Sequence, residues 1–153
     1  MKKILLAFFF IIFSYNLHAQ EKIVYLDTNY LLSQSEVGKY VNSKLKVIND
    51  KNNEEFKKIE MNIKSSEEKL IKQKNILNKE DYENKIAELT QLRNKAGNEI
   101  LKHINEILTK YSQDKSISLI IEKKNVVIGK TDLDVTSDIL SLLNKKVKKI
   151  ELN

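Results

Sequence analysis

The sequence has 153 residues, 31% of them charged, a formal net charge of +6 at pH 7, and neither cysteine nor proline. Without cysteine the chain has no disulfide bond, no thiolate metal site and no cysteine for a lipid anchor. Proline is the strongest breaker of helix interiors, so its absence permits very long helices.

The first 19 residues have the pattern of a cleaved secretory signal peptide. Lys2 and Lys3 precede a continuous apolar run over residues 4–13, and a short polar stretch then ends at Ala19. The alternative is a membrane anchor, but this run is too short for a bilayer core, which needs about 20 residues. Residues 1–19 are therefore expected to be removed, leaving an exported, soluble protein.

The next segment, residues 20–35, predicts the first part of a small body. Residues 22–27 read Lys-Ile-Val-Tyr-Leu-Asp, an apolar run with the β-branched and aromatic side chains of a buried strand. Residues 28–35 predict a turn and a short helix that carries Leu31 and Leu32.

Residues 36–112 predict a long antiparallel helical hairpin, which we call the arm. Apolar residues recur at intervals of three and four, the period of a helix. Polar residues at 78–81 predict a break and a new helix N-terminus there, so the first helix would have about 40 residues and extend roughly 60 Å. The first stripe consists of Val37, Val41, Leu45, Ile48, Asn52, Phe56, Ile59, Ile63, Leu70 and Leu77. The second consists of Tyr82, Ile86, Leu89, Leu92, Ala96, Ile100, Ile104, Ile107 and Tyr111.

The far end of the arm is the most polar part of the hairpin, so it should be the least stable. All basic residues of the chain except Arg93 are lysines, and no acidic residue lies between Lys69 and Lys79. This basic cluster predicts either an ordinary solvated helix end or a contact with anionic lipid headgroups or acidic partners. The cluster, which we call the tip lysines, consists of Lys69, Lys72, Lys74 and Lys79. Two apolar residues off the stripe, Met61 and Ile71, are candidate apolar contacts with a partner.

Residues 113–153 predict the second part of the body. Residues 117–121 and 126–128 read as two strands joined by a turn, and a final helix begins at Asp134 or Thr136. With residues 20–35 this gives an α+β protein that is predominantly α, with an arm on a small body of three strands. Such a body has open strand edges and too small a core to be stable alone, so we expect it to oligomerise. The candidate contacts between copies are Ile23, Tyr25, Leu119, Ile121 and Val127.

The sequence contains no pattern of a catalytic or metal site. His103 is the only histidine after the leader, whereas a zinc site needs three or four ligands and a nucleophile needs an adjacent base. No glycine-rich phosphate loop is present. We predict no enzymatic activity and no cofactor. Export and the scarcity of arginine also argue against a nucleic-acid partner.

The chain resembles the Skp/OmpH family of periplasmic chaperones in the order of its elements. The opening strand at residues 22–27 with Leu31-Leu32, the long charged hairpin, and the closing runs Ile-Ser-Leu-Ile-Ile-Glu at 117–122 and Asp-Val-Thr-Ser-Asp-Ile-Leu at 134–140 are similar to that family. The resemblance implies a homotrimer whose arms enclose a cavity and hold unfolded outer-membrane proteins without ATP.

The chain departs from the better-known members of this family in being lysine-rich with a single arginine. The arginine-containing lipopolysaccharide-binding cluster proposed for some members therefore cannot be assigned to residues here. The alternative function is a structural coiled coil of the cell envelope, serving as a spacer or as an adaptor for one folded partner. Promiscuity toward unfolded proteins distinguishes the two functions.

Overall fold

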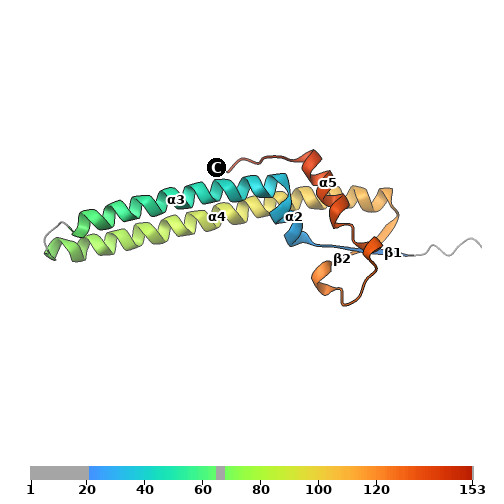
Figure 1. Ribbon diagram of the computed structural model, residues 1–153, viewed down its shortest axis with the longest axis horizontal. Helices are drawn as coiled ribbons and strands as arrows, with labels where there is room; N and C mark the ends of the chain where they lie inside the picture. The colour runs from blue at the N-terminus through green and yellow to red at the C-terminus, as the bar shows by residue number, and fades with distance from the viewer. Residues whose placement is uncertain (1–20, 65–67, 153) are drawn as a thin grey trace, which may run out of the picture.

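The computed structural model describes residues 21–64 and 68–152, with the backbone alone for residues 62–64 and 68–78. The predicted leader, residues 1–19, lies outside the described residues. The two chain ends form a small body at one end of a long helical hairpin, which projects away from it (Figure 1). This is the predicted α+β, predominantly α fold.

The N-terminal part of the body consists of strand β1 (Lys22–Leu26) and helix α2 (Thr28–Gln34), as the sequence predicts. Asp27 caps α2, because its carboxylate accepts a hydrogen bond from the backbone N–H of Tyr30 at 2.9 Å. Ser35 ends α2, and its buried hydroxyl accepts a hydrogen bond from the N–H of Gly38 at 3.1 Å. This serine thus closes one helix and caps the next.

The arm consists of helix α3 (Glu36–Lys64, 29 residues) and helix α4 (Glu68–Asp114, 47 residues). The predicted break at residues 78–81 is wrong, because these residues lie inside α4. Polar residues are tolerated there since they pair along the helix: Lys79 Nζ lies 3.8 Å from a Glu83 carboxylate oxygen, and Lys85 Nζ lies 3.8 Å from one of Asp81.

The hydrophobic core is concentrated at the base of the arm. The helix-periodic stripes meet there, and strand β1 and the last helix cover them. Among the described residues the side chains become more exposed away from the base, so that Tyr82 and Ile86 are 43% and 41% exposed. The decrease in burial toward the far end agrees with the prediction. The buried residues of this core include Val24, Leu26, Leu31, Val37, Val41, Leu45, Ala96, Ile100, Ile104, Ile107, Ile139 and Leu143.

The sheet has two parallel strands, β1 and β2 (Ile117–Glu122), rather than the three predicted. The predicted strand at 126–128 is wrong: a 3-10 turn, η2 (Lys123–Asn125), is followed by irregular chain. The partner of β2 is therefore β1, almost a hundred residues earlier, and not its own neighbour in the sequence. On its other side β1 accepts a single hydrogen bond, from the Val135 N–H to the Tyr25 carbonyl at 2.9 Å.

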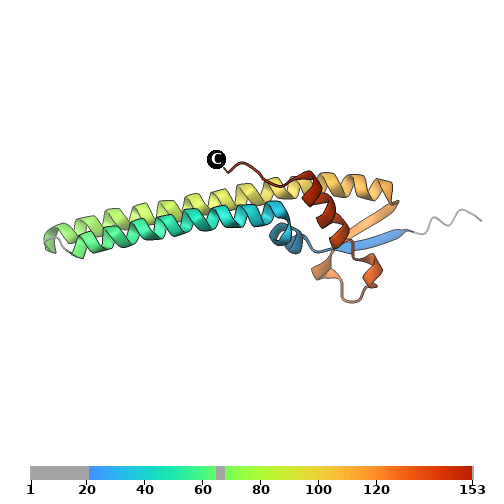
Figure 2. The same cartoon turned by 45° about the horizontal axis from the view of Figure 1, so that its top comes forward.

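A second 3-10 turn, η3 (Thr131–Leu133), leads to helix α5 (Thr136–Lys146). The helix begins at Thr136, one of the two predicted starts, with Val135 as its N-cap residue, and the Asp134 carboxylate accepts a hydrogen bond from the Thr136 N–H at 3.0 Å. The Thr136 hydroxyl in turn accepts one from the Asp27 N–H at 2.9 Å and joins the two parts of the body. After α5 the chain runs back along the arm (Figures 1 and 2).

Candidate functional site

The described part of the chain offers surfaces rather than a catalytic centre. Within it, no group of three histidine, cysteine or acidic side chains could hold a metal ion. None of the helices described is both long and apolar enough to cross a membrane. His103 lies half-buried on α4 with its two ring nitrogens each 3.7 Å from a glutamate oxygen, of Glu99 and Glu106. It is a packed helix residue, as the sequence predicts.

Polar contacts fasten α5 to both helices of the arm, among them a hydrogen bond from the Glu36 N–H to the Asn144 side-chain oxygen at 2.8 Å. Lys146 Nζ donates a hydrogen bond to a Glu106 carboxylate oxygen at 2.6 Å, and this contact lowers the pKa of Glu106. The Tyr111 hydroxyl donates one to Asp138 at 2.6 Å. Burial, together with this hydrogen bond, raises the pKa of Tyr111 to about 12. The arm and the body therefore form one continuous unit at this end.

In the outer half of the arm an aromatic pair joins the two helices. The rings of Phe56 and Tyr82 meet edge to face with centroids 4.6 Å apart. Lys85 Nζ lies 5.2 Å from the centre of the Phe56 ring and donates a hydrogen bond to a Glu55 carboxylate oxygen at 2.7 Å. This hydrogen bond raises the pKa of Lys85 and lowers that of Glu55. Sequence reasoning placed the two rings on the stripes but did not pair them.

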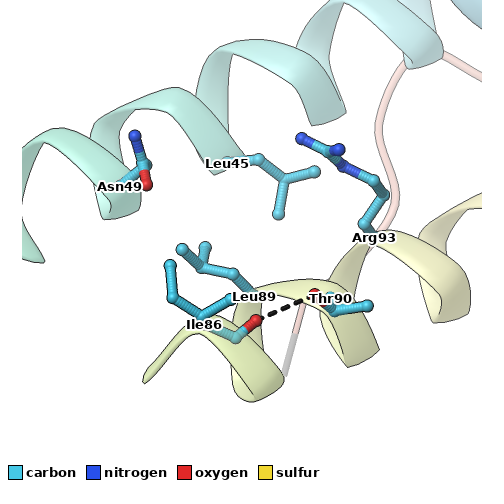
Figure 3. A pocket seen from close by; sticks show the side chains of 6 residues that line it. All are labelled: Leu45, Asn49, Ile86, Leu89, Thr90 and Arg93. Carbon is cyan, nitrogen blue, oxygen red and sulfur yellow. Dashed lines mark hydrogen bonds between the residues drawn. The ribbon is translucent and has the colours of Figure 1, made fainter. Parts of the chain in front are cut away.

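A shallow groove lies between α3 and α4 on the body side of this pair (Figure 3). Its volume is about 190 Å³, smaller than the roughly 300–1,000 Å³ of small-molecule sites. Three of its six lining side chains are apolar, and the only arginine of the chain lies at one end. The groove suits a single apolar side chain of a partner. Its lining residues are Leu45, Asn49, Ile86, Leu89, Thr90 and Arg93.

The predicted partner contacts on the outer arm are only partly described. Lys69, Lys72, Lys74 and Ile71 belong to the first turns of α4, and their side chains lie outside the described atoms. All four tip lysines therefore lie on one helix, after the turn rather than before it. Lys79 is exposed, with its Nζ 3.8 Å from Glu83, and Met61 is 62% exposed.

Three of the five predicted contacts between copies are exposed, two on the sheet and one on the loop after β2. Ile23 and Leu119 are partners in the strand register, and they are 42% and 50% exposed. Val127 is 96% exposed on the loop after β2, as is its neighbour Ile128 at 93%.

The other two predicted contacts are covered by their own chain. Ile121 is half-buried, and Tyr25 is only 9% exposed. The Tyr25 hydroxyl donates a hydrogen bond to the Lys130 carbonyl at 3.1 Å. Gly129 lies so close to the ring that a Cβ there would be 2.8 Å from Cε1. Tyr25 therefore fastens the loop that presents Val127.

The loop is also held by an ion pair whose contribution to stability depends on pH. Lys123 Nζ donates a hydrogen bond to Asp134 at 2.7 Å, which raises the pKa of Lys123. Burial acts to raise the pKa of Asp134, but hydrogen bonds from Lys123 and Thr136 outweigh it and hold the pKa below its usual value. The pair fastens the start of the loop to the start of α5.

Replacing Asp134 with asparagine is expected to lower the melting temperature at pH 7 and to lose this effect in acid. The folded-state pKa of Asp134 lies below its unfolded value of about 3.9, so its contribution is complete above that pH and disappears as the pH falls through the folded pKa. The partly exposed pair is worth about 1 kcal/mol or less. Thermal melts of Asp134→Asn and wild type should converge once the pH is below the folded-state pKa of Asp134, with Asp132→Asn as the control. A gap that persists in acid would contradict this origin.

Comparison with known proteins gives a family and a fold. The family model for outer membrane proteins of the OmpH-like type matches residues 22–143. A solved structure from Caulobacter crescentus CB15, described as an OmpH-like outer membrane chaperone, superposes with a TM-score of 0.71 at 16% sequence identity. The alignment covers 88% of this chain and 90% of that one. No curated protein sequence matches the chain.

Proposed function

The chain belongs to the OmpH-like family of outer membrane proteins, which supports a chaperone role, and we propose that it holds unfolded outer-membrane β-barrel proteins in the periplasm without ATP. The observation that carries the proposal is the arm itself. It is a long surface with half-exposed apolar side chains and a shallow groove whose volume of about 190 Å³ is small for one small-molecule ligand. The predicted leader at residues 1–19 would deliver it to the periplasm.

The arm suits many weak contacts better than one strong contact. Ile86 and Tyr82 are exposed by about two fifths, and Val47 and Met61 by 65% and 62%. Each can cover a small apolar part of an unfolded chain, and several together raise the overall affinity by multivalency. Charged residues surround them and keep the free arm hydrated. Such a surface favours many unfolded clients over one folded partner.

The body supports assembly into a homotrimer, with the arms enclosing a cavity for the client. The sheet ends at β2, whose outer edge has no partner strand in the described part of the chain. Ile23, Leu119 and Val127 offer apolar surface beside that edge. A second and a third copy would cover this surface and the strand edge together, which a small body needs for stability.

The proposal is tested by measuring whether the protein prevents the aggregation of unfolded proteins. Several outer-membrane β-barrels unfolded in denaturant are diluted into buffer with the mature protein, and light scattering is recorded. Stoichiometric amounts should keep barrels of unrelated sequence in solution without ATP. Suppression of none of them would reject the chaperone function and favour the alternative, an envelope spacer or an adaptor for one folded partner. Mass measurement by light scattering at micromolar concentration tests the trimer separately.

Replacing the tip lysines Lys69, Lys72, Lys74 and Lys79 with glutamine is expected to weaken binding of acidic clients about three- to tenfold at low salt. Exposed charges act over roughly 10 Å at 0.1 M salt, so the difference should shrink as salt is raised. Titration of a labelled acidic barrel at two salt concentrations measures it.

The matched control removes the same charge elsewhere on the arm, by glutamine at the exposed residues Lys39, Lys46, Lys57 and Lys110. Equal losses in both variants would show that only total charge matters and would return the tip to a solvated helix end. Vesicles with anionic lipid or lipopolysaccharide test whether the tip lysines also contact headgroups. Binding of the wild type that the tip variant lacks is the expected result there.

A further inference from the structure

The segment after α5 lies along the base of the arm although nothing in the helix requires it to do so. Val147 ends α5 in an extended conformation, with its N–H donating to the Leu143 carbonyl at 2.8 Å. Residues 148–152, which we call the tail, then run back beside α3 and α4 in both views of the molecule (Figures 1 and 2). The family match ends at residue 143, so the tail lies outside it.

Side chains hold the tail in place. Ile150 and Leu152 pack against the core at the base of the arm. Lys148 Nζ lies 3.5 Å from a Glu36 carboxylate oxygen, and Lys149 Nζ lies 5.7 Å from the centre of the Tyr40 ring. In the described part of the chain, no backbone-to-backbone hydrogen bond joins the tail to either helix. The contact is therefore of the kind that another polypeptide could replace.

The tail fits the arm incompletely on one side. A cavity of about 380 Å³ lies there, lined by Ile150 and Glu151 of the tail and by Lys95, Ala96 and Glu99 of α4. Protein interiors are close-packed, so a space of this size shows that the tail and α4 do not pack closely along this side. Displacing the tail would expose apolar surface at the base of the arm, because Ile150 and Leu152 pack against the core there.

The tail has the chemistry of the polypeptides that the arm is proposed to hold. It is extended, and its last residues alternate between Ile150, Glu151 and Leu152, the period of a strand with one apolar face. Unfolded β-barrel segments have this same alternation. We infer that the surface of α3 and α4 beneath the tail is a binding site for extended amphipathic segments of unfolded protein, and that the tail occupies this site until a client displaces it.

This inference deepens the proposed function, because it assigns one client surface and a built-in competitor for it. A competitor that occupies the site most of the time lowers the apparent affinity for a client by the fraction of time the site is free. Weakening the tail should therefore raise affinity for extended segments. It should leave untouched the clients' contacts with the outer arm.

The experiment uses the full mature chain and a fluorescent peptide of residues 145–153 as the probe. The first open variant carries Ile150→Ser with Leu152→Ser, and the second carries Lys148→Glu with Lys149→Glu, which repels Glu36. The control is Leu142→Ser, an apolar-to-polar change on the exposed side of α5. Circular dichroism melts establish that all variants fold. Fluorescence anisotropy then measures peptide binding.

Both open variants should bind the peptide saturably and about tenfold more tightly than the wild type and the control. A peptide carrying the two serines should not bind. Equal binding to all proteins, or binding to none, would overturn the inference. Aggregation assays separate this result from the proposed function. If the open variants bind the peptide but the protein does not protect clients, the tail site stands and the chaperone function is rejected. If the protein protects clients but the open variants do not bind the peptide, the chaperone function stands and the tail site is rejected.

Discussion

Replacing Gly38 with alanine is expected to lower the free energy of unfolding by about 3 kcal/mol or more. A Cβ at this position would lie 1.9 Å from the Leu32 carbonyl oxygen and 2.9 Å from its carbon. Both are backbone atoms of α2, so no side-chain rotation can relieve the clash. Moving α2 away would break the hydrogen bond from the Gly38 N–H to the Ser35 hydroxyl. Because a core this small supplies only about 3–5 kcal/mol, the variant should be largely unfolded.

Gly97 provides the matched control for this prediction. It lies inside α4, and a Cβ there would meet no atom within 4 Å. Alanine should therefore stabilise the protein by about 0.5–1 kcal/mol, since glycine is unfavourable in helix interiors. Urea unfolding followed by circular dichroism measures both variants. Equal and small effects at the two positions would contradict the close approach of α2 and α3.

Replacing Val127 and Ile128 together with aspartate is expected to convert the proposed trimer to monomers and to abolish client protection. These side chains are 96% and 93% exposed in the single chain, so the change removes almost no contact within the protomer. At an interface between copies, the same change would bury unpaired carboxylates, which costs several kcal/mol for each copy. Light scattering measures the mass, and the aggregation assay measures protection.

The control variant introduces the same aspartates one turn earlier, at Lys124 and Asn125, which are also exposed. It should remain a trimer, because Lys124 and Asn125 are polar and are not expected to be buried between copies. If the Val127 and Ile128 variant keeps the wild-type mass, the loop is not part of the interface. If it becomes monomeric but still protects clients, the enclosed cavity is not needed for holding.

The parts of the fold that the sequence predicted are those where local pattern and burial coincide. Strand β1 and helix α2 were correct because an apolar, β-branched run marks the strand and the pair Leu31 and Leu32 marks the short helix directly after it. The stripes were correct at the base of the arm, where Val37, Ile100 and Ile104 are nearly inaccessible to solvent. Dense burial there imposes the helical period on the sequence.

The turn of the hairpin was misplaced because the polar outer arm does not impose such a pattern. Residues 78–81 suit a helix end as well as the residues that follow Lys64 do, so cap preferences do not distinguish the two positions. Ion pairs within α4 stabilise residues 78–81 in the interior of a helix. The error shifted the pairing of the helices. Phe56 would have faced the region of Ile104 instead of Tyr82, so the aromatic pair could not be foreseen.

The strand pairing failed for a different reason. Residues 126–128 have the composition of a strand, but composition does not specify a partner. The parallel pairing of β1 with β2 depends on the long arm returning the chain to its start. Of the candidate contacts between copies, Tyr25 was misjudged because alternation along β1 gives its face but not the loop that covers it. The outer-face residues Ile23 and Leu119 follow from alternation alone.

The length of α4 beyond the core has a mechanical consequence. From Ala96, the outermost buried residue of α4 among those whose side chains are described, the helix continues outward for roughly 40 Å to Glu68. It therefore acts as a lever whose fulcrum is the core at its base. A tilt of about 5° at the fulcrum displaces the far end by roughly 3–4 Å over that length. In an assembly of three such levers, small rotations within the bodies would widen or narrow the aperture, so cargo of different girth can be admitted without unfolding any helix.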